Sequence, residues 1–187
     1  ETTAYVADAF GGLRVLDVAS PARPVEIASS KVQGGHAGSV AVASNTAFVA
    51  DRNWGVRAVS LSSGPELSQV GAYRPMAYAQ GVVVSGHYAY VAAANSGLRI
   101  VDIADPTRPT QVAIVDVAGD TKCVVARGGL IYLGSVTPNY GGGTLRIVDV
   151  ADPDRRSIGQ HAEPHDGMLE LSHVAGPAMR GQPVQGS

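Results

Sequence analysis

The chain has 187 residues, which is long enough for one domain with a sizeable core or for two small domains. Charged residues make up only 16% and the formal net charge is −2, so the basic surplus of a nucleic-acid-binding protein is absent and we expect no nucleic-acid partner. No apolar run is long enough to span a bilayer, so we also expect no membrane insertion by this segment.

Residues 1–30 contain three short runs rich in valine and other apolar residues. The middle run, GLRVLD, leads into the proline-containing turn ASPARP. In the matching phrase ADPTRP of a later unit, Pro106 fixes φ and Pro109, which has no backbone N–H, is typical of entry to an outer strand. We predict three strands here.

Residues 36–74 repeat this pattern and place a further run in front of it. The four runs are SVAVA (39–43), AFVAD (47–51), VRAVSL (56–61) and LSQVGAY (67–73), separated by turn-forming clusters. Connections this short do not allow parallel crossovers, so the unit is predicted to be a four-stranded antiparallel meander.

Residues 78–116 and 120–162 continue the series. Matching positions fall at Ala4, Ala47, Ala89 and Ile131, which is a period of 42 or 43 residues. The one cysteine, Cys123, excludes an internal disulfide, and its apolar run KCVVA predicts a buried thiol.

An array of such meanders is typical of a β-propeller, in which each unit forms one blade. The nearly continuous apolar character of the runs fits sheets that are covered on both faces. Two sets of recurring residues fit the same architecture. Aromatic rings on the second strand are predicted to fill the core, and arginines at one register of the third strand are predicted to make structural pairs. The rings are Tyr5, Phe48, Tyr90 and Tyr132, and the arginines are Arg14, Arg57, Arg99 and Arg146.

The turn after the third strand begins with an aspartate in three units. Asp17, Asp102 and Asp149 are predicted to accept backbone N–H groups from that turn.

The third-strand phrases GLRVLDVASPARP, GLRIVDIADPTRP and TLRIVDVADPDRR, each preceded by a YVA-like strand, resemble the LVIVD repeat. The resemblance covers residues 4 to about 161, and the second copy departs from it because VRAVSLSSGPE lacks the aspartate and the paired prolines. It implies a propeller of the kind found at bacterial and archaeal cell surfaces, hence an extracellular, cell-surface or periplasmic location. It supplies no catalytic residues.

The first unit lacks an innermost strand. Residues 167–173, GMLELSH, are predicted to supply an extra inner strand, which would close residues 1–175 into a ring of four blades. The alternative is a segment of a larger propeller, with neighbouring blades supplied by a longer parent chain. Residues 176–187 have the composition of a flexible tail.

The loops after the second and fourth strands open on one face of a propeller, and they vary most between the units. Exposed aromatic residues beside arginine and asparagine are typical of a recognition surface. Trp54 and Tyr140 are its candidate anchors; alternatively they are loop residues folded onto the rim. The candidate binding residues are Phe10, His36, Arg52, Trp54, Tyr78, Asn95, Asp120, Asn139, Tyr140 and His165.

Motifs for metals and cofactors are weak. His161 and His165 have a spacing that suits a helix, which Pro164 opposes, so we predict no metal site there or at Asp166. No phosphate-binding loop or nucleophile motif is present, and we expect no cofactor.

Two classes of function remain. The first is a non-catalytic binding or scaffold module that recognises a protein or glycan. The second is a propeller enzyme, hydrolytic or metal-assisted, with its site at the mouth of the central channel. Convergence of His36, Tyr78, Asp120 and His165 on one point would favour the enzyme.

Overall fold

The structure is a computed structural model that describes residues 2–31, 35–62, 64–74, 78–137 and 142–150, together with the backbone of 170–173. These residues form four β-sheets and no helix, so none of them lies in a helix able to cross a bilayer. The prediction of an all-β chain of antiparallel repeat units is confirmed.

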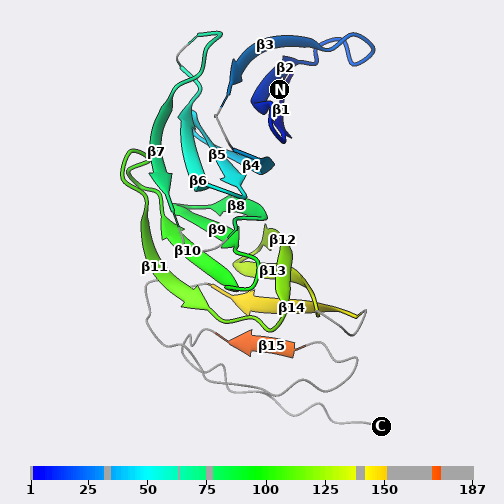
Figure 1. Ribbon diagram of the computed structural model, residues 1–187, viewed down its shortest axis with the longest axis vertical. Helices are drawn as coiled ribbons and strands as arrows, with labels where there is room; N and C mark the ends of the chain where they lie inside the picture. Colours follow the sequence, from blue (N-terminus) through cyan, green and yellow to red (C-terminus); the bar gives the residue numbers. More distant parts are fainter. Residues whose placement is uncertain are drawn as a thin grey trace.

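The first two units form the sheets at the N-terminal end of the chain, which we call sheets 1 and 2 (Figure 1). Sheet 1 contains β1 (Thr3–Asp8), β2 (Gly12–Asp17) and β3 (Val25–Ser30). Sheet 2 contains β4 (Ala37–Ala43), β5 (Thr46–Asp51), β6 (Gly55–Ser60) and β7 (Gln69–Tyr73). All their pairings are antiparallel.

Sheets 3 and 4 follow in chain order. Sheet 3 contains β8 (Gly81–Ser85), β9 (Tyr88–Ala92), β10 (Leu98–Asp102) and β11 (Thr110–Val115). Sheet 4 contains β12 (Asp120–Arg127), β13 (Leu130–Val136), β14 (Gly143–Asp149) and β15 (Glu170–His173). Sheets 2 and 3 are the four-stranded meanders expected from their sequences.

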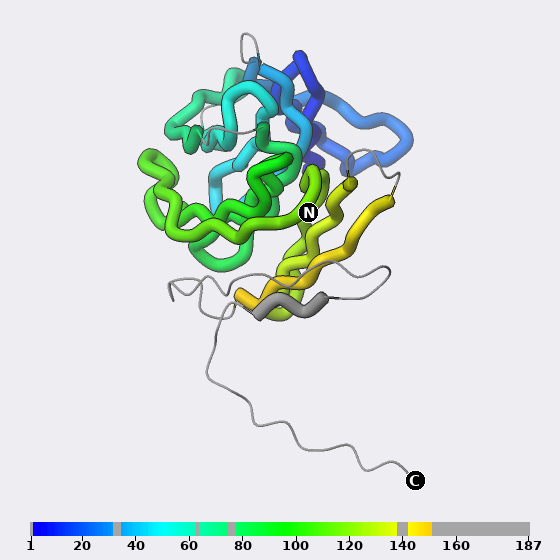
Figure 2. The backbone as a smooth tube through the Cα atoms, turned by 60° about the horizontal axis from the view of Figure 1, so that its bottom comes forward, coloured from blue at the N-terminus to red at the C-terminus, as the bar shows by residue number. Residues whose placement is uncertain are grey.

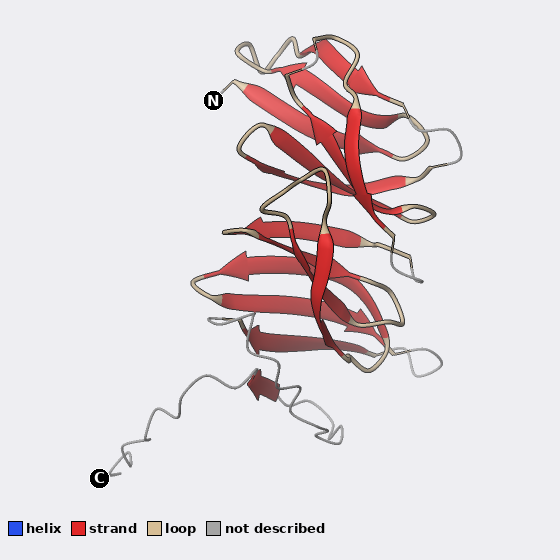
Figure 3. Ribbon diagram, turned by 90° about the vertical axis from the view of Figure 1, so that its left-hand side faces the viewer, coloured by secondary structure: helices blue, strands red, loops and turns tan. Residues whose placement is uncertain are grey.

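The sheets stack face against face along an open arc, with β4, β8 and β12 in contact along its inner side (Figures 1 and 3). Each junction holds its own apolar cluster. Leu13 packs with Val49 between sheets 1 and 2, Phe48 with Val91 between sheets 2 and 3, and Tyr90 with Leu133 between sheets 3 and 4.

Three of the four second-strand aromatic residues lie in these junctions, whereas Tyr132 is partly exposed and belongs to none of the three clusters. Phe48 and Tyr90 are each only 2% exposed, and Tyr5 packs against the first cluster while partly exposed. Burial raises the pKa of the Tyr90 hydroxyl, because the phenolate would lose its hydration there. The predicted core role is therefore confirmed for these three rings.

In sheets 1 and 3, the third strand of the repeat approaches the fourth strand closely where it begins, and glycine permits this. Gly12 and Gly97 have φ of 79° and 71°, and a Cβ added at either would meet a backbone carbonyl oxygen of the outer strand at 2.1 Å (Ser30) or 2.3 Å (Val115). The glycine that begins GLRVLD and GLRIVD is thus required by both conformation and space.

The predicted aspartate turns are present after β2 and β10. Asp17 Oδ1 accepts the N–H of Ala19, and Asp102 Oδ1 accepts the N–H of Ala104, both at 2.8 Å. In the same turn of sheet 3, the hydroxyl and N–H of Thr107 both donate to Asp105, which lowers the pKa of that carboxyl. The turn after Asp149 lies outside the described residues.

The prediction that residues 167–173 form an inner strand is wrong for the part that the structure describes. β15 pairs in parallel with β14, at the outer edge of sheet 4 and opposite the inner strand β12. A parallel partner needs a long crossover, and the residues between Asp149 and Glu170 provide that length. Sheet 1 therefore keeps three strands, and no backbone pairing joins sheet 1 to sheet 4 among the described residues (Figure 2).

The buried thiol was also predicted wrongly. Cys123 is exposed, because no further sheet covers this side of β12 in the part of the chain described. The predicted tail, residues 176–187, lies outside the described residues.

Candidate functional site

The turns after the second strands meet the segments that lead into the next inner strands, at one end of the sheets. Ala9, after β1, forms a two-way backbone bridge with Ala37 at the start of β4, with both N···O distances 3.0 Å. Ala94, after β9, is bridged to Thr121 at the start of β12, whose N–H donates to the Ala94 carbonyl oxygen at 2.9 Å. The loops that carry the candidate binding residues are therefore fixed to the neighbouring sheet by backbone hydrogen bonds.

Asp51, at the end of β5, organises the loops around the first two sheets. Its Oδ1 accepts the N–H of His36 at 2.9 Å and that of Asn53 at 3.0 Å, and its side chain is fully buried. The N–H of Arg52 donates to the carbonyl oxygen of His36 at 3.1 Å. A buried carboxylate thus holds His36 and the Arg52–Trp54 turn together.

The second oxygen of Asp51 faces a buried guanidinium. Arg57 Nε lies 3.4 Å from Asp51 Oδ2, and the Arg57 side chain is only 2% exposed. Burial lowers the pKa of Arg57, and the charge of Asp51 opposes that effect. Neither terminal nitrogen of this guanidinium has a hydrogen-bond partner among the described residues.

Two of the other three recurring arginines show the predicted structural pairing, whereas Arg99 Nε has no hydrogen-bond partner among the described residues. Arg14 binds Asp8 and, at 2.7 Å, Glu26, while Arg146 donates to the carbonyl oxygen of Asp116 at 3.1 Å. The two carboxylates raise the pKa of Arg14, and the hydrogen bond that Arg14 donates to Glu26 is the largest cause.

Two aromatic contacts form at this end of sheets 1 and 2. The Phe10 ring meets the His36 ring edge to face, with centroids 5.0 Å apart and the planes inclined by 76°. The guanidinium carbon of Arg74 lies 4.6 Å from the centroid of the Trp54 ring, which is a cation–π distance. Phe10 is 77% exposed, whereas Trp54 is half-buried.

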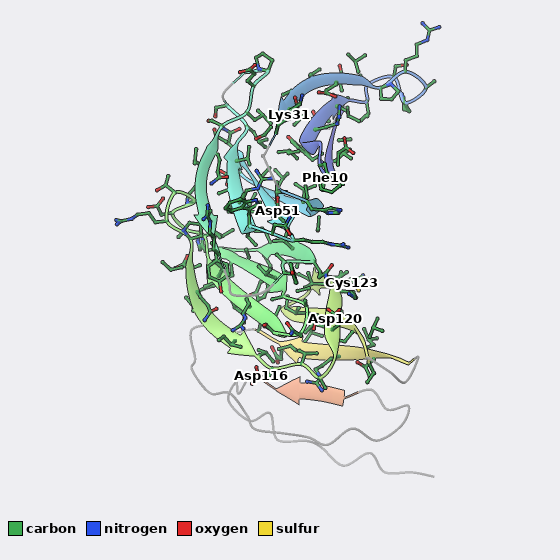
Figure 4. All side chains as sticks on the ribbon, viewed as in Figure 1. Phe10, Lys31, Asp51, Asp116, Asp120 and Cys123 are labelled. Carbon is green, nitrogen blue, oxygen red and sulfur yellow. The ribbon has the colours of Figure 1, made fainter. Side chains whose placement is uncertain are left out.

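The remaining described candidates lie apart from these contacts. Tyr78 is 59% exposed and Asn95 is exposed, while Asp120 pairs with Lys122 at 2.6 Å. Figure 4 shows Phe10 and Asp51 on the first two sheets and Asp120 farther along the arc. No hydrogen bond or ion pair joins His36, Tyr78 and Asp120 within the described ranges.

Three candidates, Asn139, Tyr140 and His165, lie outside the described residues, as do His161 and Asp166. Within the rest of the chain, no group of three histidine, cysteine, aspartate or glutamate side chains is placed to hold a metal ion.

Asp51 is the residue that the sequence analysis missed. The signal was present, because Asp8 and Asp51 each precede a recurring arginine by six positions, whereas the third unit has Ala93 at the equivalent place. Arginine and aspartate at a fixed separation in two repeats predict an ion pair across the second and third strands.

Comparison with solved structures shows the fold. The chain is similar to a computationally designed protein, Ika8, with a TM-score of 0.66 and 10% identity over 91% of this chain and 48% of that chain. It is similar to BamB from Moraxella catarrhalis, with a TM-score of 0.58 and 14% identity over 88% of this chain and 44% of that one. The β-propeller domain of Cps50 (Swd1) from Myceliophteria thermophila gives a TM-score of 0.56 and 17% identity over 82% of this chain and 50% of that domain structure. The chain thus spans about half the length of each.

No curated protein matches the chain. The LVIVD repeat family matches residues 3–32, 34–63 and 77–117, which together are more than half of the sequence. These stretches contain the strands of sheet 1, most of sheet 2 and all of sheet 3, in agreement with the motifs in their third strands. The chain belongs to the LVIVD repeat family.

Proposed function

We propose that this chain is a non-catalytic binding or scaffold module of a secreted or cell-surface protein, and that it binds a protein or glycan through the loops at one end of its sheets. The propeller repeat fold supports a binding or scaffold role. The resemblance of the repeat to cell-surface propellers supports the location.

The observation that carries the proposal is the exposed ring of Phe10 on a supported loop. Phe10 is 77% exposed, while the loop beneath it is bonded to Ala37 and its ring rests on His36. An exposed aromatic residue held in place by rigid neighbours loses little conformational entropy on binding, which is typical of an anchor at an interface.

The two ends of the sheets differ in a way that favours this end as the binding surface. At the opposite end, the turns of sheets 1 and 3 repeat one arrangement, in which Asp17 and Asp102 each accept the N–H of the residue two positions on. The proposed binding end instead presents Phe10 and Tyr78, with Arg74 over Trp54. A protein surface or a sugar ring can pack on such aromatic faces while arginine and asparagine donate hydrogen bonds.

A binding screen with matched variants tests the proposal. The wild-type chain is applied to an array of defined glycans and to a displayed peptide library, and each captured ligand is measured by calorimetry. Phe10→Ser is expected to weaken binding about tenfold or more, because it removes an anchor without touching the core. Val42→Ser is the control, since Val42 is 38% exposed but lies near the opposite end of sheet 2.

Equal binding by Phe10→Ser and wild type would contradict the proposed surface. If neither the glycan array nor the peptide library yields a ligand, recognition of these two ligand classes is contradicted. The location is tested separately by fractionation of the producing cells, where recovery of the chain in the cytosol would contradict it.

A further inference from the structure

Each sheet has two faces, and their residues repeat from sheet to sheet. We call the face that meets the preceding sheet the front face and the face that meets the following sheet the rear face. At every junction inside the chain, the rear face of one sheet packs on the front face of the next. The end sheets therefore show what such faces look like when no other described sheet covers them.

The front face of sheet 1 is open. Val6 on β1 is 38% exposed, whereas its equivalents Val49, Val91 and Leu133 are each 0% exposed beneath a preceding sheet. The ion pairs behave in the same way, because the Arg14 side chain is 40% exposed and that of its equivalent Arg57 is 2% exposed.

The rear face of sheet 4 is open over β12 and the start of β14, whereas Ile147, farther along β14 on the same face, is 8% exposed. Leu145 on β14 is 52% exposed, whereas its equivalents Leu13, Val56 and Leu98 are at most 1% exposed beneath a following sheet. Val125 on β12 is 58% exposed, and the thiol of Cys123 is exposed beside it (Figure 4). This apolar surface is equivalent to one that is buried three times elsewhere in the chain.

The two open faces are complementary, because the same pair of positions meets at each internal junction. Leu13 packs in one cluster with Val49, Val56 with Val91, and Leu98 with Leu133. The next pair in this series is Leu145 and Val6, which lie at opposite ends of one chain. An interface that continues an arrangement used three times already has a suitable shape and apolar character.

We propose that the front face of sheet 1 and the rear face of sheet 4 are docking surfaces for a second copy of this chain. Sheet 1 of each copy packs on sheet 4 of the other, and two such junctions close a ring of two copies. Closure at two copies fits the observation that four sheets span about half of the solved β-propeller domain structure. It also removes both apolar faces from water, which an open chain of copies would not do.

The test measures mass in solution in a reducing buffer, which prevents a disulfide between Cys123 residues. Sedimentation equilibrium of the 187-residue chain is expected to give twice the monomer mass of 19.1 kDa. Val6→Glu and Leu145→Arg are each expected to give monomers, because either substitution places a charge in both junctions of the ring. Val70→Glu is the control, since Val70 is 37% exposed on the outer strand β7 of an internal sheet.

Mixing Val6→Glu with Leu145→Arg gives the decisive result. One junction of the mixed dimer has two native faces. The other junction brings the introduced carboxylate opposite the introduced guanidinium. An equimolar mixture is therefore expected to recover the dimer. A wild-type monomer at high concentration, a dimer that survives Val6→Glu, or a mixture that stays monomeric would each overturn the proposal. A mass that rises above that of two copies as the protein concentration increases would overturn closure at two. Circular dichroism checks that every variant is folded.

Discussion

At the scale of single residues, the hairpins between the first and second strands require a left-handed conformation. Ser44 has φ of 51°, and its equivalents Gly86 and Gly128 have φ of 60° and 59°. A serine in this conformation is strained by contact between its Cβ and the following carbonyl oxygen, whereas glycine is not. Sheet 2 therefore contains a strained residue where sheets 3 and 4 have glycine.

Ser44→Gly is expected to raise the free energy of unfolding by about 0.5 kcal/mol, because relief of strain exceeds the added entropy of the unfolded chain. Gly86→Ser is the matched reverse change. No atom lies within 4 Å of a Cβ added at Gly86, so its expected loss of stability is conformational and not steric. Urea denaturation measures the free energy of unfolding of both variants. Changes of the same sign in Ser44→Gly and Gly86→Ser would contradict the explanation by strain at Ser44.

At the scale of elements, a covering sheet determines how much the loss of one member of an ion pair destabilises the chain. Arg57 and Asp51 on sheet 2 are buried beneath sheet 1, whereas Arg14 and Asp8 occupy the same register of sheet 1 and are 40% and 44% exposed. Removal of one member of a buried pair leaves a charge that water does not reach, whereas an exposed partner is simply hydrated.

Arg57→Leu is expected to destabilise the chain by about 3 kcal/mol, because it leaves the Asp51 carboxylate buried without its cation. Addition of Asp51→Asn is expected to recover most of that loss, since the amide oxygen still accepts the N–H groups of His36 and Asn53. Arg14→Leu is the exposed control and is expected to change stability little. Chemical denaturation of the four proteins checks this, and a double variant no more stable than Arg57→Leu would contradict it.

At the scale of the whole molecule, the chain is an array in which each sheet depends on its neighbours. β1 pairs only with β2 among the described strands, whereas β5 and β9 are each paired on both edges. The inner edge of β1 has no described strand beside it, even when a second copy covers the face of sheet 1. Local opening should therefore be easiest at this edge.

Hydrogen exchange measured by mass spectrometry checks this expectation. Amides in peptides covering Thr3–Asp8 are expected to exchange about tenfold faster than those covering Thr46–Asp51, because half of the β1 N–H groups point to the open edge. Peptides covering Tyr88–Ala92 serve as a second internal reference. Equal protection of β1 and β5 would show that another strand pairs with β1.

The sequence predicted the repeat architecture well because local patterns encode it. The repeat period and the aspartate turns are set by neighbouring residues, and the structure contains the repeated sheets and the turns after β2 and β10. The placement of β15 was not predictable in this way, because pairing with β14 depends on which strand edge is free in the assembled sheets.

The candidate site was only partly predictable from sequence. Variable loops identified Phe10, His36 and Trp54, which the structure places in aromatic contacts at one end of sheets 1 and 2. Asp51 was missed because its role depends on backbone N–H groups from two separate loops. Cys123 was predicted as buried because an apolar run indicates a strand but not whether another sheet covers it.

The lone thiol of Cys123 provides a reporter that the molecule already carries. It is exposed, and the sequence contains no other cysteine, so a maleimide dye or nitroxide would attach at one known position on β12. Such a label would report directly on whatever approaches that side of the chain, without any engineered attachment point.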